Sequence, residues 1–229
     1  MAVRRHADLA ALARAMADEL PALVRRSLDE TSACHFALSG GNTPRALYQE
    51  LVARGRAFLP WDRIDLWWGD ERCVPPDHPE SNFGMAKAEL IQPLNLDSSR
   101  WHRMHGEDEP AAAAQAYEDH IYGCLGSSPV FTVAFLGIGD DGHTASLFPG
   151  GAIDLARIVI AAKAPSGQPR LSMTPKLINA ARHVRFLVAG ASKAEALAGI
   201  VNGTSNAPAR LIENGDLQWL VDEGAAKGI

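Results

Sequence analysis

Residues 130–148, VFTVAFLGIGDDGHTASLF, show what kind of fold to expect. The part from Val130 to Leu136 is an apolar run of the length of a buried strand, and a glycine-rich loop follows it directly. Gly137, Gly139 and Gly142 let the backbone turn sharply and approach a ligand closely. The same loop carries two aspartates and a histidine, which can transfer protons near neutral pH. A buried strand that ends in such a loop is typical of the active-site edge of an open α/β sheet.

The rest of the chain alternates strand-like with helix-like segments. Apolar and β-branched runs predict strands at 35–38, 64–68, 158–162, 170–173 and 184–189. Helical spacing and caps predict helices at 8–28, 44–53, 81–91, 110–122, 175–181 and 192–201, with a kink or break expected at Pro21. Segments 211–213 and 218–221 are compatible with edge strands or a short helix. We therefore predict an α/β protein, a three-layer, Rossmann-like, doubly wound and mostly parallel sheet, with residues 1–229 as a single domain.

Composition excludes several classes of function. The 229 residues are 47% hydrophobic and carry a formal net charge of −5, which argues against nucleic acid as the main partner. The three cysteines are far apart and form no CxxC, so neither a disulfide framework nor a zinc site is expected. Reduced thiols fit the cytoplasm. No apolar run is long enough to span a membrane, and no signal-peptide core is found, so we expect no membrane partner.

The glycine loop also matches a dinucleotide-binding fingerprint, Gly137-x-Gly139-x-x-Gly142. The match is weak, because Asp140 and Asp141 would repel a pyrophosphate at that position. The fingerprint also needs an acidic residue after the next strand, where this chain has Lys163. We therefore expect no nucleotide cofactor. No cluster of residues with metal-ligand spacing is found either, so no metal is expected.

A second loop, Ser39-Gly-Gly-Asn-Thr43, lies between a predicted strand and a predicted helix with Thr43 as its N-cap. Its hydroxyl groups, its exposed backbone N–H groups and the positive end of the helix suit a phosphate. An ordinary capped turn explains this loop alone equally well. It lacks the lysine of a Walker motif and the first glycine of a nucleophile elbow.

Charged residues follow the aromatic strand 64–68 as Gly69-Asp-Glu-Arg72. Arg72 could neutralise an anion or a developing oxyanion, whereas a solvated salt-bridge cluster is the alternative. The polar stretch His78-Pro-Glu-Ser-Asn82 follows and could fold over a ligand. His78 alone is more typical of a surface residue.

The proton-transfer group of the glycine loop is His143, with Asp141 placed to orient its ring. A loop histidine bonded to the backbone is the alternative interpretation. Two cations lie further along the chain, Arg170 before a strand and Lys193 in the first turn of a helix. The helix dipole disfavours a cation there, which indicates that Lys193 serves a ligand, although either residue alone is more often solvent-facing.

These loops, in this order, resemble those of the 6-phosphogluconolactonases of the pentose phosphate pathway. The most specific matching pieces are Trp68-Gly-Asp-Glu-Arg72, His78-Pro-Glu-Ser-Asn82 and Gly139-x-Asp-Gly-His-Thr-Ala-Ser-Leu-Phe-Pro149. That family hydrolyses 6-phosphoglucono-1,5-lactone to 6-phosphogluconate without a metal or other cofactor. The resemblance implies that Asp141 and His143 are the catalytic pair and that Arg72 contacts the lactone. The implied substrate- and phosphate-binding residues are Ser39, Gly40, Gly41, Asn42, Thr43, Asp70, Arg170 and Lys193.

Two other functions compete with lactone hydrolysis. Glucosamine-6-phosphate deaminases share the fold but typically carry Asp-Glu-Tyr where this chain has Asp-Glu-Arg72, and a glutamate where it has Leu147 and Phe148. The third candidate is a non-catalytic sugar-phosphate sensor, which usually carries an added DNA-binding module. We expect the lactonase, acting as a monomer or homodimer on a small sugar-phosphate lactone.

Overall fold

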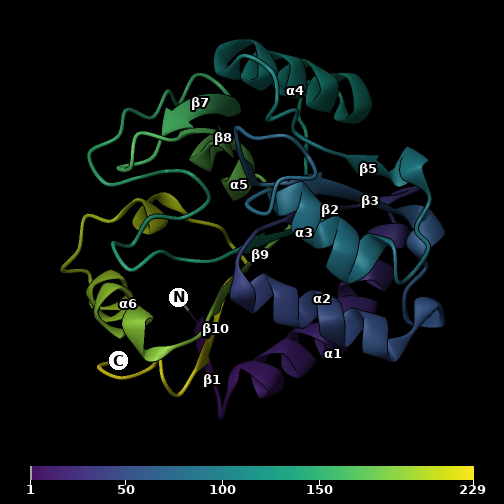
Figure 1. Ribbon diagram of the computed structural model, residues 1–229. Coiled ribbons are helices and arrows are strands. Elements are labelled where there is room, and N and C mark those ends of the chain that lie inside the picture. The colour runs from purple at the N-terminus through teal and green to yellow at the C-terminus, as the bar shows by residue number, and fades with distance from the viewer. Residues whose placement is uncertain (1) are drawn as a thin grey trace.

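A seven-stranded parallel sheet forms the centre of the computed structural model, which describes residues 2–229 (Figure 1). The strand order is β1-β10-β9-β6-β2-β3-β5. The strands are β1 (Ala2–His6), β10 (Leu217–Asp222), β9 (His183–Val188), β6 (Val133–Leu136), β2 (Cys34–Leu38), β3 (Ile64–Trp68) and β5 (Trp101–His102). From β2 the chain winds outward through β3 to β5, and then returns to place β6 on the other side of β2. The predicted doubly wound α/β architecture is confirmed.

Helices cover both faces of this sheet and give three layers. They are α1 (Leu9–Leu28), α2 (Asn42–Arg54), α3 (Asn82–Ala86), α4 (Pro110–Leu125), α5 (Pro175–Asn179) and α6 (Ala194–Val201). Figure 1 shows α1 and α2 side by side on one face and α4 on the opposite face. Each long helix buries an apolar stripe, which in α1 includes Leu12, Met16 and Leu20.

A second, smaller sheet lies beside the parallel one, whereas the sequence analysis predicted a single, mostly parallel sheet. Strands β7 (Val159–Lys163) and β8 (Pro169–Met173) pair antiparallel with each other, and β8 pairs antiparallel with β4 (Asp70–Arg72). Only residues 164–168 connect β7 to β8. A parallel crossover needs a dozen residues or more, so this connection permits only a hairpin. The small sheet packs beside α4 (Figure 1).

Other differences from the prediction are local. Strand β1 was not predicted, because its sequence AVRRH lacks an apolar run; it is an edge strand, where charged residues are common. Strand β6 begins at Val133 rather than at residue 130. Helix α1 continues through Pro21 without a break. The predicted helix 81–91 is α3 followed by a π-helical turn at Lys87–Ile91. At the C-terminal end, Leu217–Asp222 is a strand inside the sheet and Pro208–Leu211 a 3₁₀ turn.

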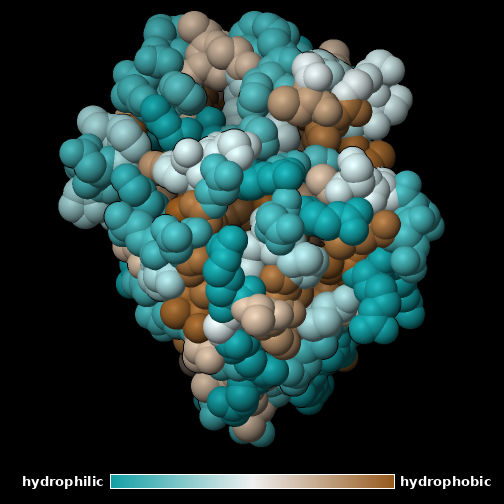
Figure 2. Space-filling view, turned by 90° about the vertical axis from the view of Figure 1, so that its right-hand side faces the viewer, coloured by the Kyte–Doolittle hydropathy of each residue, from teal (hydrophilic) through white to brown (hydrophobic). Residues whose placement is uncertain are grey.

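The hydrophobic core lies on both faces of the central strands. Its largest fully buried side chains include Trp67, Trp68 and Trp219. Figure 2 views the side of the molecule that lies on the right in Figure 1, where hydrophobic patches lie between hydrophilic residues. No helix within residues 2–229 combines the length and apolar character that a membrane span requires.

Strand β9 carries a buried charged side chain. Arg185, on β9, is only 1% exposed, and its guanidinium contacts the carboxylates of Glu19 at 2.6 Å and Asp216 at 3.0 Å. His183 also contacts Asp216, at 2.5 Å. Burial alone would raise the pKa of Asp216, but the hydrogen bonds from Arg185 and His183 outweigh it and lower the pKa to about 2. The ionised carboxylate therefore stabilises the fold.

We expect Asp216→Asn to lower the free energy of unfolding at pH 7 by about 1 kcal/mol, a modest value because the Asp216 side chain is 40% exposed and screened by solvent. A carboxyl whose pKa is lowered by folding stabilises the protein above the unfolded pKa of about 4, and that contribution is lost as the pH falls toward the folded pKa. The stability difference between the two proteins should therefore shrink between about pH 4 and pH 2. Urea unfolding across this range measures it, and a pH-independent difference would contradict the assignment.

Candidate active site

A pocket of about 340 Å³ opens where the order of the parallel strands reverses. Strands β2 and β6 are neighbours there, but the chain leaves them in opposite directions across the sheet. Ligands of open α/β sheets bind at such a switch point, outside the carboxyl ends of the strands. The pocket is lined by Ser39, Gly40, Gly41, Asp70, Arg72, Asn82, Gly137, Ile138, Gly139, His143, Ala145, Ser146, Phe148, Arg170 and Lys193.

The loop after β2 presents backbone to this pocket. Gly41 is the N-cap of α2 with φ of 95°, a left-handed conformation that favours glycine. The helix therefore begins at Asn42, which corrects the prediction of Thr43 as its N-cap. No side chain caps this helix, and its first backbone hydrogen bond runs from Arg45 N–H to Gly41 C=O. The N–H groups of the first turn are thus available to an anion.

Gly40 lies against Asn82, which links the first loop to the small sheet. A Cβ atom at position 40 would lie 1.8 Å from Asn82 Oδ1, so no larger residue fits without displacing that amide. Asn82 Nδ2 donates to the backbone oxygen of Asp70 at 2.9 Å and to its Oδ1 at 3.2 Å. Ser146 Oγ donates to Asp70 Oδ2 at 2.7 Å. The Asp70 carboxylate is therefore fixed at the pocket wall.

The carboxylate of Glu71 anchors the loop that leads to α3. Only 2% of this residue is exposed, and it accepts hydrogen bonds from the backbone N–H groups of Arg72 at 2.8 Å, Asn82 at 2.6 Å and Phe83 at 2.7 Å. Burial raises the pKa of Glu71, and the backbone donors oppose that effect. Residue 71 therefore holds Asn82 in place rather than contacting the pocket itself.

Two arginines lie opposite each other across β4 and β8. Arg72 and Arg170 are partners in the antiparallel register, where like charges normally destabilise a sheet. Arg72 Nη1 donates to the backbone oxygen of Glu80. Burial and the neighbouring Arg72 lower the pKa of Arg170, which is half-buried. A concentration of positive charge in a partly buried position suits an anionic ligand.

His143 and Asp141 form a close pair in the glycine loop. His143 Nδ1 lies 2.6 Å from Asp141 Oδ1, which also accepts the backbone N–H of His143 at 3.0 Å. Burial would raise the pKa of Asp141, but the hydrogen bonds from the backbone and ring of His143 hold it below its usual value. An ionised Asp141 fixes the proton of His143 on Nδ1 and leaves Nε2 as the basic nitrogen. A Cβ atom at Gly139 would lie 2.0 Å from Nδ1, so glycine is needed there.

Lys193 reaches the edge of the pocket from the turn before α6. Its Nζ lies 2.6 Å from Asp140 Oδ1, and Ser192 Oγ donates to the same oxygen at 3.1 Å. These two donors lower the pKa of Asp140. Asp140 thus holds the lysine in position at the mouth of the pocket.

Three buried polar atoms of the pocket have no hydrogen-bond partner within residues 2–229: Ser39 Oγ, Asn82 Oδ1 and Arg170 Nε. Buried polar groups in folded proteins are normally paired, so an unpaired set in one pocket is suited to a polar ligand. Two are donors and one is an acceptor, which fits a ligand that carries both hydroxyl groups and negative charge.

The structure brings most of the predicted site residues to this pocket. Ser39, Gly40, Gly41, Asp70, Arg72, His143, Arg170 and Lys193 line it, and Asp141 contacts it through His143. Asn42 and Thr43 do not line it; they contribute the first turn of α2. Sequence reasoning did not include Asn82, Ser146 or Phe148. The sequence carries a polar motif at residues 78–82, but nothing in it indicates that Glu71 directs Asn82 inward.

Comparison with known proteins shows the family to which the chain belongs. The family model described as glucosamine-6-phosphate isomerases/6-phosphogluconolactonase matches residues 7–220. A 6-phosphogluconolactonase of Synechocystis is 41% identical over 216 residues, covering 90% of this chain and 89% of the relative. One from Haemophilus influenzae is 38% identical over 201 residues, covering 84% of this chain and 86% of the relative.

Solved structures extend the likeness to the whole fold. The 6-phosphogluconolactonase from Trypanosoma cruzi superposes with a TM-score of 0.89 at 29% identity and covers 100% of this chain and 96% of its own. A monomeric glucosamine-6-phosphate deaminase superposes with a TM-score of 0.85 over 100% of both chains, but at 21% identity, which shows a shared fold alone. The chain belongs to the glucosamine-6-phosphate isomerase/6-phosphogluconolactonase family.

Proposed function

We propose that this protein hydrolyses 6-phosphoglucono-1,5-lactone to 6-phosphogluconate. The observation that carries the proposal is that the His143–Asp141 pair shares one pocket with Arg72 and Arg170. A base on one wall and positive charge on the other are what hydrolysis of an anionic lactone requires. The relatives named 6-phosphogluconolactonase, which cover most of the chain, support the same function.

In the proposed mechanism, His143 Nε2 removes a proton from a water molecule that attacks C1 of the lactone. Asp141, bound to Nδ1, stabilises the imidazolium that results. The C1 oxygen becomes negatively charged, and Arg72 stabilises that charge. The bond from C1 to the ring oxygen then breaks, and the imidazolium returns its proton to the departing oxygen. The products are a carboxylic acid and a hydroxyl group, and the histidine is regenerated.

The phosphate of the substrate is assigned to the other residues of the pocket. Arg170, Lys193 and the N–H groups at the start of α2 supply positive charge and donors. Ser39 Oγ, which is buried and has no hydrogen-bond partner in the described part of the chain, supplies a further donor. Binding energy gained at the phosphate positions C1 beside His143 and so contributes to the rate.

Nuclear magnetic resonance of the C1 carbon tests the proposed function. Fresh 6-phosphogluconolactone hydrolyses spontaneously, and its lactone signal is replaced by that of a carboxylate. Added protein should accelerate this replacement in proportion to its concentration. An unchanged rate of conversion would contradict the proposal.

Glucosamine 6-phosphate should release no ammonia in the presence of this protein. Phe148 packs on His143 with ring centroids 4.8 Å apart, and Leu147 is buried beside it. Neither side chain can transfer the additional proton that ring opening and isomerisation need. Arg72 would also repel a substrate ammonium group. Ammonia measured with a coupled dehydrogenase at a rate comparable to lactone hydrolysis would favour the deaminase instead.

Chelators should leave lactone hydrolysis unchanged at temperatures well below unfolding. In the proposed mechanism, His143 Nδ1 is engaged by Asp141, and a protein base rather than a metal activates the water. Within residues 2–229, no group of three histidine, cysteine or acidic side chains with metal-ligand spacing lies in this pocket. Assays with and without EDTA measure the effect. Activity that is lost in EDTA and restored by a divalent ion would refute the mechanism.

We further propose that the chain acts as one domain, in the cytoplasm, as a monomer or homodimer. The pocket draws residues from position 39 to position 193, so both halves of the chain contribute to one site. The three cysteines are free thiols, as expected in a reducing compartment.

A further inference from the structure

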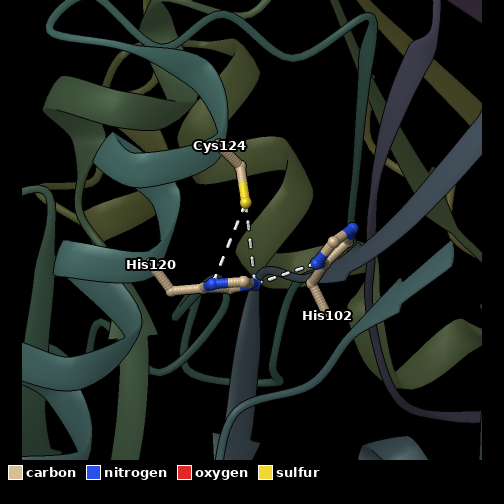
Figure 3. Close-up of side chains that lie close together, drawn as sticks. All are labelled: His102, His120 and Cys124. Atoms are coloured by element: carbon tan, nitrogen blue, oxygen red, sulfur yellow. Dashed lines mark hydrogen bonds between the residues drawn. The ribbon is translucent and has the colours of Figure 1, made fainter. Parts of the chain in front are cut away.

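A cluster of three side chains lies outside the catalytic pocket, at the edge of the central sheet. His102 ends the edge strand β5, and His120 and Cys124 project from helix α4, which covers it (Figure 3). The four-residue separation of His120 and Cys124 places both on one face of the helix, as in helical zinc-binding motifs. None of the three lines the catalytic pocket.

The ligand atoms of this cluster lie at metal-site distances. His102 Nδ1 is 2.8 Å from His120 Nε2, and Cys124 Sγ is 3.9 Å from the same Nε2. A tetrahedral zinc ion, with bonds of about 2.0–2.1 Å to nitrogen and about 2.3 Å to sulfur, separates two nitrogens by about 3.3 Å and nitrogen from sulfur by about 3.6 Å. Cys124 Sγ is also 3.8 Å from His120 Nδ1, so it lies over the imidazole ring (Figure 3). Changes of about half an ångström in the two distances above, with a shift of Sγ toward the Nε2 side of the ring, would convert the cluster into three ligands of one ion.

A carboxylate behind the cluster supports the same interpretation. Asp65 Oδ1 lies 3.9 Å from His102 Nε2, the ring nitrogen that faces away from His120. Asp65 Oδ1 also accepts a hydrogen bond from Arg100 Nη1 at 3.1 Å. A carboxylate on this side of the ring favours the tautomer of His102 with the proton on Nε2, which leaves Nδ1 as the nitrogen that can bind a metal. Metal-binding histidines in proteins commonly have such a carboxylate partner.

The site is accessible from solvent. His120 and Cys124 are exposed, and a cavity of about 440 Å³ beside them is lined by both histidines of the cluster.

We propose that His102, His120 and Cys124 bind one thiophilic divalent cation, of which Zn²⁺ is the best match, with a water molecule at the fourth position. Mixed nitrogen and sulfur ligands favour zinc over magnesium or calcium. The ion would connect α4 to β5, an edge strand of only two residues, and so act as a clasp between a helix and the sheet. This site is separate from the proposed hydrolysis, which needs no metal.

Cobalt(II), a spectroscopic substitute for zinc, tests the ligand set. One equivalent of Co²⁺ should give tetrahedral d–d bands and a thiolate-to-cobalt charge-transfer band, and Zn²⁺ should abolish both. Cys124→Ser should remove the charge-transfer band, and His120→Ala should weaken Co²⁺ binding by at least about tenfold. Both residues are exposed, so the variants should fold normally. The matched controls Cys73→Ser and His78→Ala should bind Co²⁺ as the natural sequence does. An octahedral spectrum, or equal binding by Cys124→Ser, would overturn the proposal.

Thermal unfolding tests the clasp independently of spectroscopy. A ligand that binds only the folded state raises the unfolding midpoint. Zn²⁺ should therefore raise the midpoint of the natural sequence, and EDTA should reverse the rise. In the double variant His120→Ala/Cys124→Ser the midpoint should not respond to Zn²⁺. No rise in the natural sequence, or an equal rise in the double variant, would contradict the clasp.

Discussion

Replacement of His143 by alanine should lower the rate of lactone hydrolysis by about 10²–10⁴-fold, the range expected for loss of a general base. Asp141 Oδ1 lies 2.6 Å from His143 Nδ1 and keeps the ring proton there, so His143 Nε2 is the atom that accepts the proton of water. The variant should still bind 6-phosphogluconate, because the cations assigned to the phosphate are unchanged. A coupled dehydrogenase assay gives the rate, and calorimetry gives the affinity.

Two further variants sharpen this test. Asp141→Asn keeps the shape of the side chain but removes the charge that stabilises the imidazolium, so its rate should fall while binding persists. His105→Ala removes an exposed histidine that does not line the pocket and should leave the rate unchanged. Turnover by His143→Ala close to that of the natural sequence would eliminate His143 as the base.

Arg170→Ala should weaken binding of 6-phosphogluconate by about 10–150-fold, the equivalent of about 1.5–3 kcal/mol for a lost charge-assisted hydrogen bond. Arg170 is half-buried and opposes Arg72 across the small sheet, and its Nε atom has no hydrogen-bond partner among residues 2–229. Two like charges opposite each other and a buried unpaired donor destabilise the protein when no ligand is bound. A bound anion offsets this destabilisation. Calorimetry with 6-phosphogluconate and with unphosphorylated gluconate measures the effect, which should be much smaller for gluconate.

Lys193→Ala provides a second measurement of the same kind. Its effect should have the same direction but a smaller size, because Lys193 is already paired with Asp140 at 2.6 Å and must share its charge. Equal losses for the phosphorylated and unphosphorylated ligands in both variants would show that neither cation binds the phosphate.

The central strands and long helices were predictable because the order of apolar and polar residues in each matches the way it is buried. Apart from Asp65, strand β3 consists of apolar and aromatic residues and is buried, and α1 carries an apolar stripe that begins after the N-cap Asp8. Which strands pair, and in which direction, was harder to predict than where the strands lie in the sequence. Strand β7 begins with an apolar run like that of a parallel strand, and the short connection at 164–168 is the feature that indicates a hairpin with β8.

The candidate site was predictable to the extent that its residues follow strands. Loops after β2, β3 and β6 meet at one edge of a parallel sheet, so Ser39, Arg72 and His143 could be expected to lie together. Asn82 reaches the pocket because a buried carboxylate, Glu71, binds its backbone N–H, and that contact has no signature in the sequence.

The metal-ligand cluster was missed for a similar reason. The sequence contains no CxxC, and His102 is far in sequence from His120 and Cys124. The four-residue spacing of His120 and Cys124 within α4 was the feature of the sequence that could have indicated a metal site. The third ligand comes from β5, and only the packing of α4 on the sheet edge brings it close.

The initial rate of 6-phosphogluconolactone hydrolysis at neutral pH, compared with that of unphosphorylated gluconolactone, tests the account most directly. One coupled or pH-stat assay measures both rates above spontaneous hydrolysis. The account predicts a rate that is linear in protein concentration, a much higher kcat/KM for the phosphorylated lactone, and loss of that activity in His143→Ala. Hydrolysis no faster than the spontaneous reaction, or equal kcat/KM for the two lactones, would contradict it.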